Sequence, residues 1–358
     1  MKNDRSIGAP VSRRSFLRVG ATAGLLLPSA GGMTLLLSGC GSDDGPKVNA
    51  DGSISGTYMA ASSLTLSYVE TMVAKERGYF AEYGLDMEIK GGQGTATAIQ
   101  AVLGGSADLT RANGINAVIA VANEQAPLVS IASLRQKSQF EVVSMPDKAI
   151  RNPAQLAGRT CGIVSTGGAT ENLLDVMLIN AGVDPKTVKR PVTGVGTAAY
   201  ELARKGEIDA WVCVNTDRAT IQKDIGEVVF FSTDEFAPMP SDSYNTSLKM
   251  IESDSDMPVK FLAGVLKAIE YASKEENWDQ VIADLRKYNP EANPEQARAE
   301  LPLLVESWLA AGPDKVLQMN EQTWLSGQES LIKAGLVKSA APIEKLIYKD
   351  YLERARNL

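Results

Sequence analysis

Short apolar runs alternate with amphipathic stretches through most of the chain beyond residue 53. In the first half, the apolar runs that predict strands cover residues 54–60, 85–89, 107–110 and 128–134. The stretches between them have helical spacing and cover residues 68–76, 96–103 and 117–123. Strands that alternate with helices of this length are joined by crossover connections, so this half of the chain predicts a parallel sheet.

A second series of the same kind begins near residue 141. It predicts strands at residues 159–164, 188–192, 208–214 and 228–231, and helices at residues 169–181 and 197–205. Residues 244–251 are expected to be extended. Helices fill the remainder from about residue 259, where an apolar face recurs with the helical period at Phe261, Leu262, Val265, Leu266 and Ile269. The pattern predicts an α/β protein with two parallel-sheet lobes.

The beginning of the chain has the pattern of an export signal. Arg13 and Arg14 lie in a twin-arginine motif, and a mostly apolar stretch follows. A proline and a glycine pair interrupt that stretch, which argues against a permanent membrane helix. It ends in Leu-Ser-Gly-Cys, which resembles a lipobox whose cysteine, Cys40, is lipidated after cleavage. We expect a lipoprotein signal peptide at residues 1–39 and a flexible tether at residues 40–52. The alternative is a plain membrane anchor with an incidental cysteine.

The charge balance is acidic outside this signal. The chain has 36 Lys and Arg residues and 43 Asp and Glu residues, a net charge of -7. Five of the bases and one of the acids lie in the first 39 residues, which leaves -11 for the remainder. An acidic surface without a basic stripe repels phosphate backbones, so we expect no nucleic-acid partner.

The residue types also limit the chemistry. The sequence has no histidine, which removes the usual general base, the Ser/His/Asp and Cys/His arrangements and most zinc sites. No pair of carboxylates stands out by its spacing, and we expect no enzyme activity, no cofactor and no metal. Cys161 and Cys213 lie in apolar runs and are expected to be buried free thiols, with a disulfide as the alternative.

Two blocks of short motifs carry a family resemblance. The first block reads AKERGYF at residues 74–80, YGLDMEI at 83–89 and AVLGGSAD at 101–108. The second reads LAGRTCGI at residues 156–163, AGVD at 181–184 and ARKGEIDA at 203–210. Together they resemble the periplasmic solute-binding proteins of ABC importers, in the group that takes nitrate, sulfonates, taurine and thiamine-type pyrimidines.

The resemblance implies a bilobal periplasmic-binding-protein-like fold of type II, in which two lobes close over a ligand about a two-segment hinge. Lobe 1 is expected to comprise residues 53–140 plus 244–358, and lobe 2 residues 141–243. The hinge segments would then lie near residues 141 and 243. In sheets of this kind the ligand lies beyond the carboxyl ends of the strands.

Two glycine-bearing turns, each between a strand and a helix, are candidate ligand contacts. Glycine lets the backbone approach a ligand closely, and free N–H groups at a helix start attract negative charge. The matching turn of the resembled group lines its cleft. The expected contacts are Ser165, Thr166, Gly168 and Thr170 in lobe 2 and Gln93, Gly94 and Thr95 in lobe 1. Helix capping without a ligand is the alternative for both turns.

A third candidate is Arg111, at the carboxyl end of a predicted strand. Its guanidinium could pair with a carboxylate or sulfonate, and an ordinary surface arginine is the alternative. Asn113 lies just beyond it. With the two turns, Arg111 predicts a small anionic or zwitterionic solute. We expect Arg111→Ala to weaken its binding by roughly 2–5 kcal/mol if the pair is desolvated.

The remaining candidates are polar residues that follow other strands. Asn215 and Asp217 come after the strand that contains Trp211 and are expected to face the same cleft. Asp217 could accept a hydrogen bond from an amine or ring N–H of the ligand, or cap the helix that follows. Ser62 and Ser63 are expected to close the near side of the cleft.

These features together predict the extracytoplasmic, lipid-anchored substrate-binding component of an ABC-type importer. We expect a monomer that is exported by the twin-arginine route and delivers a small solute to a membrane permease and its ATPase. One alternative is a ligand-sensing protein of the same fold. A second is an enzyme of the pyrimidine-biosynthesis type, although those enzymes depend on a histidine that this chain lacks.

Overall fold

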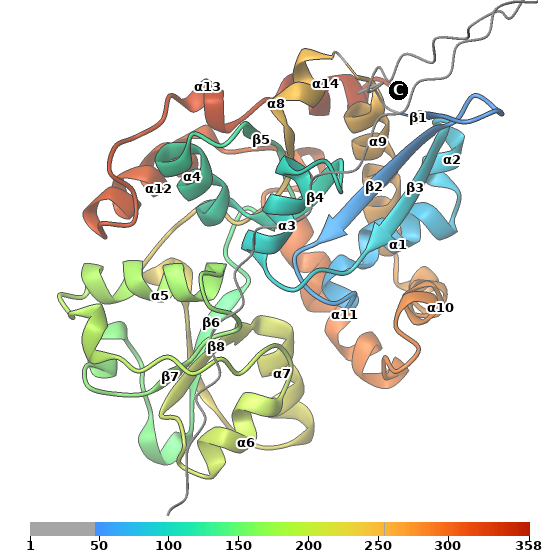
Figure 1. Cartoon of the computed structure of the whole chain (residues 1–358). Coiled ribbons are helices and arrows are strands. Elements are labelled where there is room, and N and C mark those ends of the chain that lie inside the picture. Colours follow the sequence, from blue (N-terminus) through green and yellow to red (C-terminus); the bar gives the residue numbers. More distant parts are fainter. Residues whose placement is uncertain (1–46, 254) are drawn as a thin grey trace, which may run out of the picture. The chain divides into compact units, whose positions relative to one another are not determined.

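Two mixed β-sheets with flanking helices form the part of the chain that the computed structural model describes, residues 47–358 without residue 254 (Figure 1). The first sheet has the order β1-β2-β4-β10-β5, and β3 also pairs with β2. Its strands are β1 (Lys47–Val48), β2 (Ile54–Ala60), β3 (Leu85–Lys90), β4 (Leu109–Asn113), β5 (Leu128–Ser133) and β10 (Asp242–Ser247). The second sheet has the order β7-β8-β6-β9 and consists of β6 (Phe140–Ser144), β7 (Cys161–Gly162), β8 (Ala210–Val214) and β9 (Val229–Ser232).

The strand directions correct the prediction of two parallel sheets. β2 is parallel to β3 and β4, and β7 is parallel to β8, as the alternation of strands and helices predicts. β10 is antiparallel to both of its neighbours in the first sheet, and β6 is antiparallel to both of its neighbours in the second. Each of these two strands is the first one after the chain crosses from the other sheet. It starts beside the end of a parallel strand, so it runs in the opposite direction and needs no crossover helix.

The chain passes between the two sheets twice, at residues 134–139 and at residues 233–241. Side chains near the ends of these passages are bonded to one another. Arg135 Nη1 and Gln139 Nε2 both donate to Asp242 Oδ2, at 2.6 and 3.0 Å. The predicted hinge would involve these two passages.

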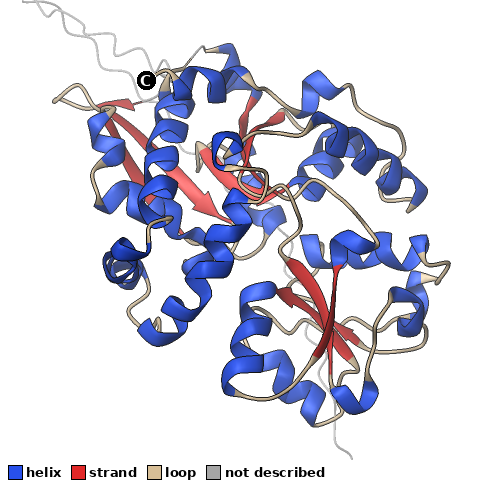
Figure 2. Ribbon diagram, turned by 180° about the vertical axis from the view of Figure 1, so that it is seen from behind, coloured by secondary structure: helices blue, strands red, loops and turns tan. Residues whose placement is uncertain are grey.

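Helices cover both faces of the first sheet, which is seen from behind in Figure 2. Along β2, Tyr58 and Ala60 belong to one hydrophobic core and Met59 packs against another, as the two-residue period of a strand requires. The helices on the Tyr58 side are α1 (Val69–Glu76), α2 (Tyr79–Glu82), α9 (Met257–Ala272), α10 (Trp278–Tyr288), α11 (Pro294–Leu309) and α14 (Asp350–Arg356). Those on the Met59 side are α3 (Thr95–Leu103), α4 (Gly114–Glu124), α12 (Glu321–Lys333) and α13 (Ile343–Leu346).

The helices of the second sheet are α5 (Ala169–Asn180), α6 (Ala198–Arg204) and α7 (Asn215–Asp224). Trp211 on β8 is fully buried and meets the ring of Tyr200 on α6 edge to face, at a centroid distance of 6.5 Å. In the first core, the rings of Phe80 and Phe261 stack at 5.2 Å. Phe261 belongs to the predicted apolar face of α9, whose residues are buried or partly buried in this core.

Three short segments differ from the sequence prediction. Residues 188–192 make only isolated bridges, to Thr160 and Ile163, and form no regular strand. Residues 244–251 are only half extended, because β10 ends where the Ser247 side chain caps α8 (Leu248–Glu252) by accepting from the Met250 N–H at 3.2 Å. Part of the predicted tether is also structured, since β1 pairs antiparallel with β2.

Cys161 and Cys213 are buried free thiols, which confirms that prediction. Cys161 on β7 pairs in register with Ala210 on β8, and Cys213 lies three residues further along β8. Three residues of strand span roughly 10 Å, more than the ~7 Å that a disulfide tolerates between Cα atoms. Burial raises the pKa of Cys161 to about 12, so its thiol stays protonated.

The predicted signal peptide and Cys40 lie outside the described residues. Within the described part, no helix has both the length and the apolar character that a membrane span requires.

Candidate ligand-binding site

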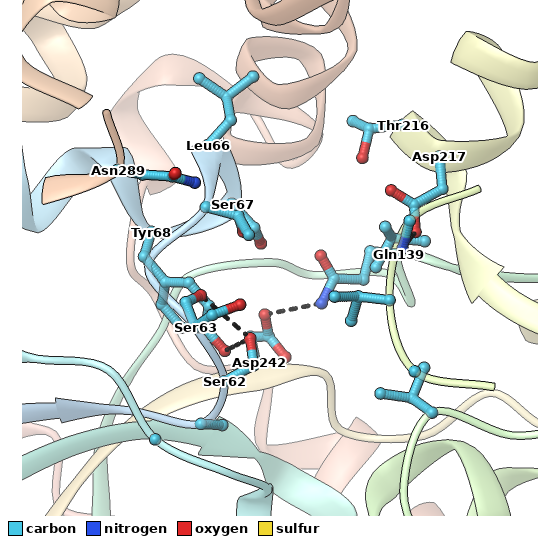
Figure 3. A pocket seen from close by; sticks show the side chains of 18 of the residues that line it. Ser62, Ser63, Leu66, Ser67, Tyr68, Gln139, Thr216, Asp217, Asp242 and Asn289 are labelled. Carbon is cyan, nitrogen blue, oxygen red and sulfur yellow. Dashed lines mark hydrogen bonds between the residues drawn. The ribbon is translucent and has the colours of Figure 1, made fainter. Parts of the chain in front are cut away.

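A cavity of about 550 Å³ lies at the carboxyl ends of the parallel strands, with walls from both sheets (Figure 3). Its first wall consists of the loops that follow β2 and β3 together with the end of β4. The second wall consists of the turn before α5, the loop around residue 195 and the start of α7, and the third consists of residues from α10 to α11. Figure 3 shows Thr216 and Asp217 across the cavity from Ser62, Ser63 and Tyr68.

Most of the predicted contact residues line this cavity. They are Ser62, Ser63, Gln93, Gly94, Thr95, Arg111, Asn113, Ser165, Thr170 and Asp217. The sequence located them because each one follows a strand or lies at the end of one, and strand ends of one sheet meet at one edge. Their contact with a solute stays a prediction.

The structure keeps Thr166, Gly168 and Asn215 out of the cavity wall. Thr166 is exposed to solvent at the outside of its turn. Gly168 is buried behind Ser165, close enough that a Cβ atom at position 168 would lie 2.2 Å from Ser165 Oγ. Asn215 is the first residue of α7, and its neighbours Val214 and Thr216 face the cavity instead.

Sequence reasoning missed the wall that α10 and α11 provide. Its cavity-lining residues include Leu285, Asn289, Asn293, Gln296 and Glu300. They belong to the helical tail, far in sequence from the strand ends, and no motif marks them. The only available signal was the pair Gln296 and Glu300, polar residues one turn apart on a helix that also has a buried apolar side.

The backbone donors of both turns are largely used within the protein. In the first turn, the N–H groups of Gly92 and Gly94 donate to the carbonyls of Ser62 and Ala61 at 2.9 and 2.7 Å. In the second, the Gly167 N–H donates to Glu171 Oε2 at 2.6 Å. These three N–H groups are therefore not free for an anion. Binding of an anion by the N–H groups at the starts of α3 and α5 stays a prediction.

Two glycines of the first turn are required by its geometry. Gly94 has a φ of 134°, a backbone conformation that is strained for any residue with a side chain. A Cβ atom at Gly92 would lie 2.2 Å from the carbonyl oxygen of Ala60, at the end of β2. The loop is thus packed against β2 by backbone contacts, which positions Gln93 and Thr95 at the cavity.

Arg111 is at the base of the cavity, and both of its terminal nitrogens donate to other residues of the protein. Its Nη1 atom donates to Glu70 Oε1 at 2.7 Å and to the Ser67 carbonyl at 2.5 Å, and its guanidinium stacks on the Tyr68 ring at 3.8 Å. Only 1% of the residue is exposed, so the alternative of a surface arginine is wrong. Burial opposes the charge, yet the carboxylates of Glu70 and Asp242 raise the pKa of Arg111 further above its usual value.

The charges around Arg111 form a balanced group. Arg135 Nη1 binds Asp242 Oδ2, which also lies 3.6 Å from Arg111 Nε. Two guanidinium groups thus face the two carboxylates of Glu70 and Asp242, and all four side chains are buried. The base of the cavity presents no net positive charge, so Arg111 supplies no uncompensated cation for an anionic solute.

Asp217 has a different environment. Its Oδ2 atom accepts from the Gly196 N–H at 2.8 Å, and it does not cap α7. Burial raises the pKa of Asp217 to about 7; the hydrogen bond from Gly196 opposes the rise, and the negative charge of Glu300 adds to it. The carboxylates of Asp217 on α7 and Glu300 on α11 therefore repel each other electrostatically across the cavity.

The described residues contain no group of three or more Cys, Asp or Glu side chains arranged to hold a metal ion. The cavity instead combines hydroxyl, amide and carboxylate side chains with apolar walls, which suits a small organic molecule.

Comparison with known proteins identifies similar chains. The formylaminopyrimidine-binding protein of Halalkalibacterium halodurans is 24% identical over 229 residues, 62% of this chain and 66% of that protein. The periplasmic nitrate-binding protein NrtA of Synechocystis PCC 6803 superposes with a TM-score of 0.67 at 13% identity, over 85% of this chain and 88% of that one. The alkanesulfonate-binding protein SsuA of Xanthomonas axonopodis pv. citri gives 0.64 at 14% identity, over 82% and 98%.

These superpositions confirm the periplasmic-binding-protein fold. The model of the family described as NMT1/THI5 like matches residues 67–277, which include both sheets' central strands and most of the cavity wall. The chain belongs to the NMT1/THI5-like family.

Proposed function

We propose that this protein is the lipid-anchored, extracytoplasmic solute-binding component of an ABC-type importer. The observation that carries the proposal is the cavity of about 550 Å³ with walls from both sheets, in a chain that is similar to a protein named for the formylaminopyrimidine it binds. The solute would be enclosed there and handed to a permease and its ATPase. Capture followed by release needs no catalytic group, and the absence of histidine fits a protein that binds without reacting.

Direct hydrogen bonds between elements of the two sheets support a structure that closes. Thr220 Oγ1 on α7 donates to Glu300 Oε1 on α11 at 2.6 Å. Asn116 Nδ2 on α4 donates to the Gly167 carbonyl before α5 at 3.0 Å. A solute that contacts both sides adds to these bonds and favours the closed state over an open one.

We expect a bound solute to reduce the radius of gyration of the protein, because closure about the two passages brings the sheets together. Small-angle X-ray scattering tests this with a solute that raises the melting temperature, and a solute that does not raise it serves as the control. Identical scattering curves with and without saturating solute would rule out closure as the capture mechanism.

The anchor gives a second test. We expect Cys40→Ala to abolish lipidation, because only the cysteine thiol can accept the diacylglycerol. Metabolic labelling with an alkyne fatty acid measures this, and Cys213→Ala is the matched control because that thiol is buried within the fold. Label that persists in Cys40→Ala would exclude Cys40 as the anchored residue.

The same fold would also serve a sensor. Transport predicts that deleting the gene abolishes uptake of the solute, whereas sensing predicts normal uptake with a lost transcriptional response. We favour transport because the relatives named above are binding proteins.

A further inference from the structure

The cavity has an acidic wall that the binding of an anion does not explain. Asp217 and Thr220 are three residues apart on α7 and so share one face of that helix. Thr220 donates to Glu300 Oε1, which places Glu300 of α11 within about one helical turn of Asp217. Both carboxylates line the cavity, and Glu300 is only 8% exposed. We name Asp217 and Glu300 the carboxylate pair.

Neither member of the carboxylate pair has a cationic partner among the described residues. The hydrogen-bond donors that each one has are neutral: the Gly196 N–H at 2.8 Å for Asp217, and Thr220 and Gln296 at 2.6 and 2.8 Å for Glu300. These bonds use one oxygen of each carboxylate, and the described residues offer no partner for Asp217 Oδ1 or Glu300 Oε2. A buried carboxylate without a positive charge nearby is costly.

The protein's own cation in this cavity cannot fill that role. Arg111 lies at the base, where Glu70 and Asp242 already pair with it. Another lining carboxylate, Glu291 at the exposed rim, adds negative charge. A positive charge that pairs with the ionised carboxylate pair would therefore come from outside the described residues.

We infer that the carboxylate pair binds a protonated nitrogen of the solute, so that the solute is an organic cation or a zwitterion and not a simple anion. This rests on the proposed function and identifies the class of its solute. An amine, amidine or protonated ring nitrogen supplies both the charge and the N–H donors that the two free oxygens accept. A metal ion is a poorer fit, because two carboxylates fall short of its ligand number.

The protonated nitrogen would also take part in closure of the two walls over the solute. Asp217 follows a strand of the second sheet, whereas Glu300 lies on a helix of the first core. A cation between them is held from both sides and offsets the repulsion that closing two carboxylates together creates. The Thr220–Glu300 hydrogen bond orients the Glu300 carboxylate for this contact.

Matched solutes that differ only at the nitrogen test the inference directly. We would measure melting temperature and calorimetric affinity with taurine against 2-hydroxyethanesulfonate and with 4-aminobutyrate against 4-hydroxybutyrate, each pair at one pH. In at least one pair, the amine should bind at least tenfold more tightly than its hydroxyl analogue. Asp217→Asn and Glu300→Gln should each remove most of that preference, whereas Glu306→Gln, an exposed position on α11 away from the cavity, should keep it.

Three results would overturn the inference. The first is a hydroxyl analogue or nitrate that binds more tightly than every amine tested. The second is tight binding of Ca²⁺ or Mg²⁺ alone, and the third is that no amine tested raises the melting temperature. The first of these results, if the affinity is unchanged in Asp217→Asn and Glu300→Gln, would leave solute capture intact and refute only the cation.

Discussion

Removing the Glu70 carboxylate is expected to lower the free energy of unfolding by about 3–5 kcal/mol, because Glu70→Ala leaves Arg111 charged and buried with an incomplete set of partners. Glu70 Oε1 accepts from Arg111 Nη1 and from the Tyr244 hydroxyl, at 2.7 and 2.8 Å. Asp242 cannot replace it, since its Oδ2 atom already binds Arg135 and Gln139. Urea denaturation of the wild type and the variant measures the difference.

Two further variants distinguish a buried charge from a general loss of packing. Glu82→Ala removes a carboxylate whose ion pair with Lys267 is half exposed, and it should cost less than about 1 kcal/mol. The double change Glu70→Leu with Arg111→Met removes both charges and should recover much of the lost stability. A loss below about 1 kcal/mol for Glu70→Ala would contradict a desolvated ion pair.

Arg111→Ala is expected to lower the stability of the protein as well as any affinity for the solute. The sequence led us to expect a loss of solute affinity of roughly 2–5 kcal/mol from a direct contact. In the structure the same change leaves Glu70 buried without its cation, so destabilisation accompanies any effect on binding. Affinity and stability must therefore be measured on the same preparation of the variant.

Stability is expected to fall as the pH rises from about 4 to about 7, by about 2–4 kcal/mol from Asp217 alone. The pKa of Asp217 is raised in the fold, from 3.8 to about 7. The folded protein thus holds this proton where the unfolded chain releases it, so the contribution of Asp217 is greatest below pH 4 and is lost by pH 7. The full shift would correspond to about 4 kcal/mol, and partial exposure of Asp217 reduces that figure.

Chemical denaturation across this pH range, without added solute, measures the effect. Asp217→Asn should be more stable than the wild type at pH 7.5 and should have a shallower pH dependence. Burial raises the pKa of Asp234 to about 6, so this residue also lowers stability as the pH rises. Asp234 does not line the cavity, and Asp234→Asn is therefore the matched control. A wild-type protein that is more stable at pH 7.5 than Asp217→Asn would show that the ionised carboxylate stabilises the fold.

The sequence by itself determined the two series of strands and helices, and most of the contact residues predicted from it line the cavity. Periodicity located β2, β3, α5 and α9, because a buried face repeats every two residues in a strand and every 3.6 in a helix. Ser62, Gln93 and Asp217 could be predicted for a related reason, since each directly follows a strand and strand ends of one sheet converge.

Only the tertiary structure decided the strand directions and the charge of the site. β6 and β10 are antiparallel because of where the chain crosses between the sheets, and local periodicity carries no information about that. Arg111 looked like a free cation in sequence, because its partners Glu70 and Asp242 are 41 and 131 residues away. Glu300 could not be predicted as a site residue for the same reason, since α11 brings it to Asp217 from a distant part of the sequence. The chemistry of a cavity depends on which side chains the packing of the chain places together.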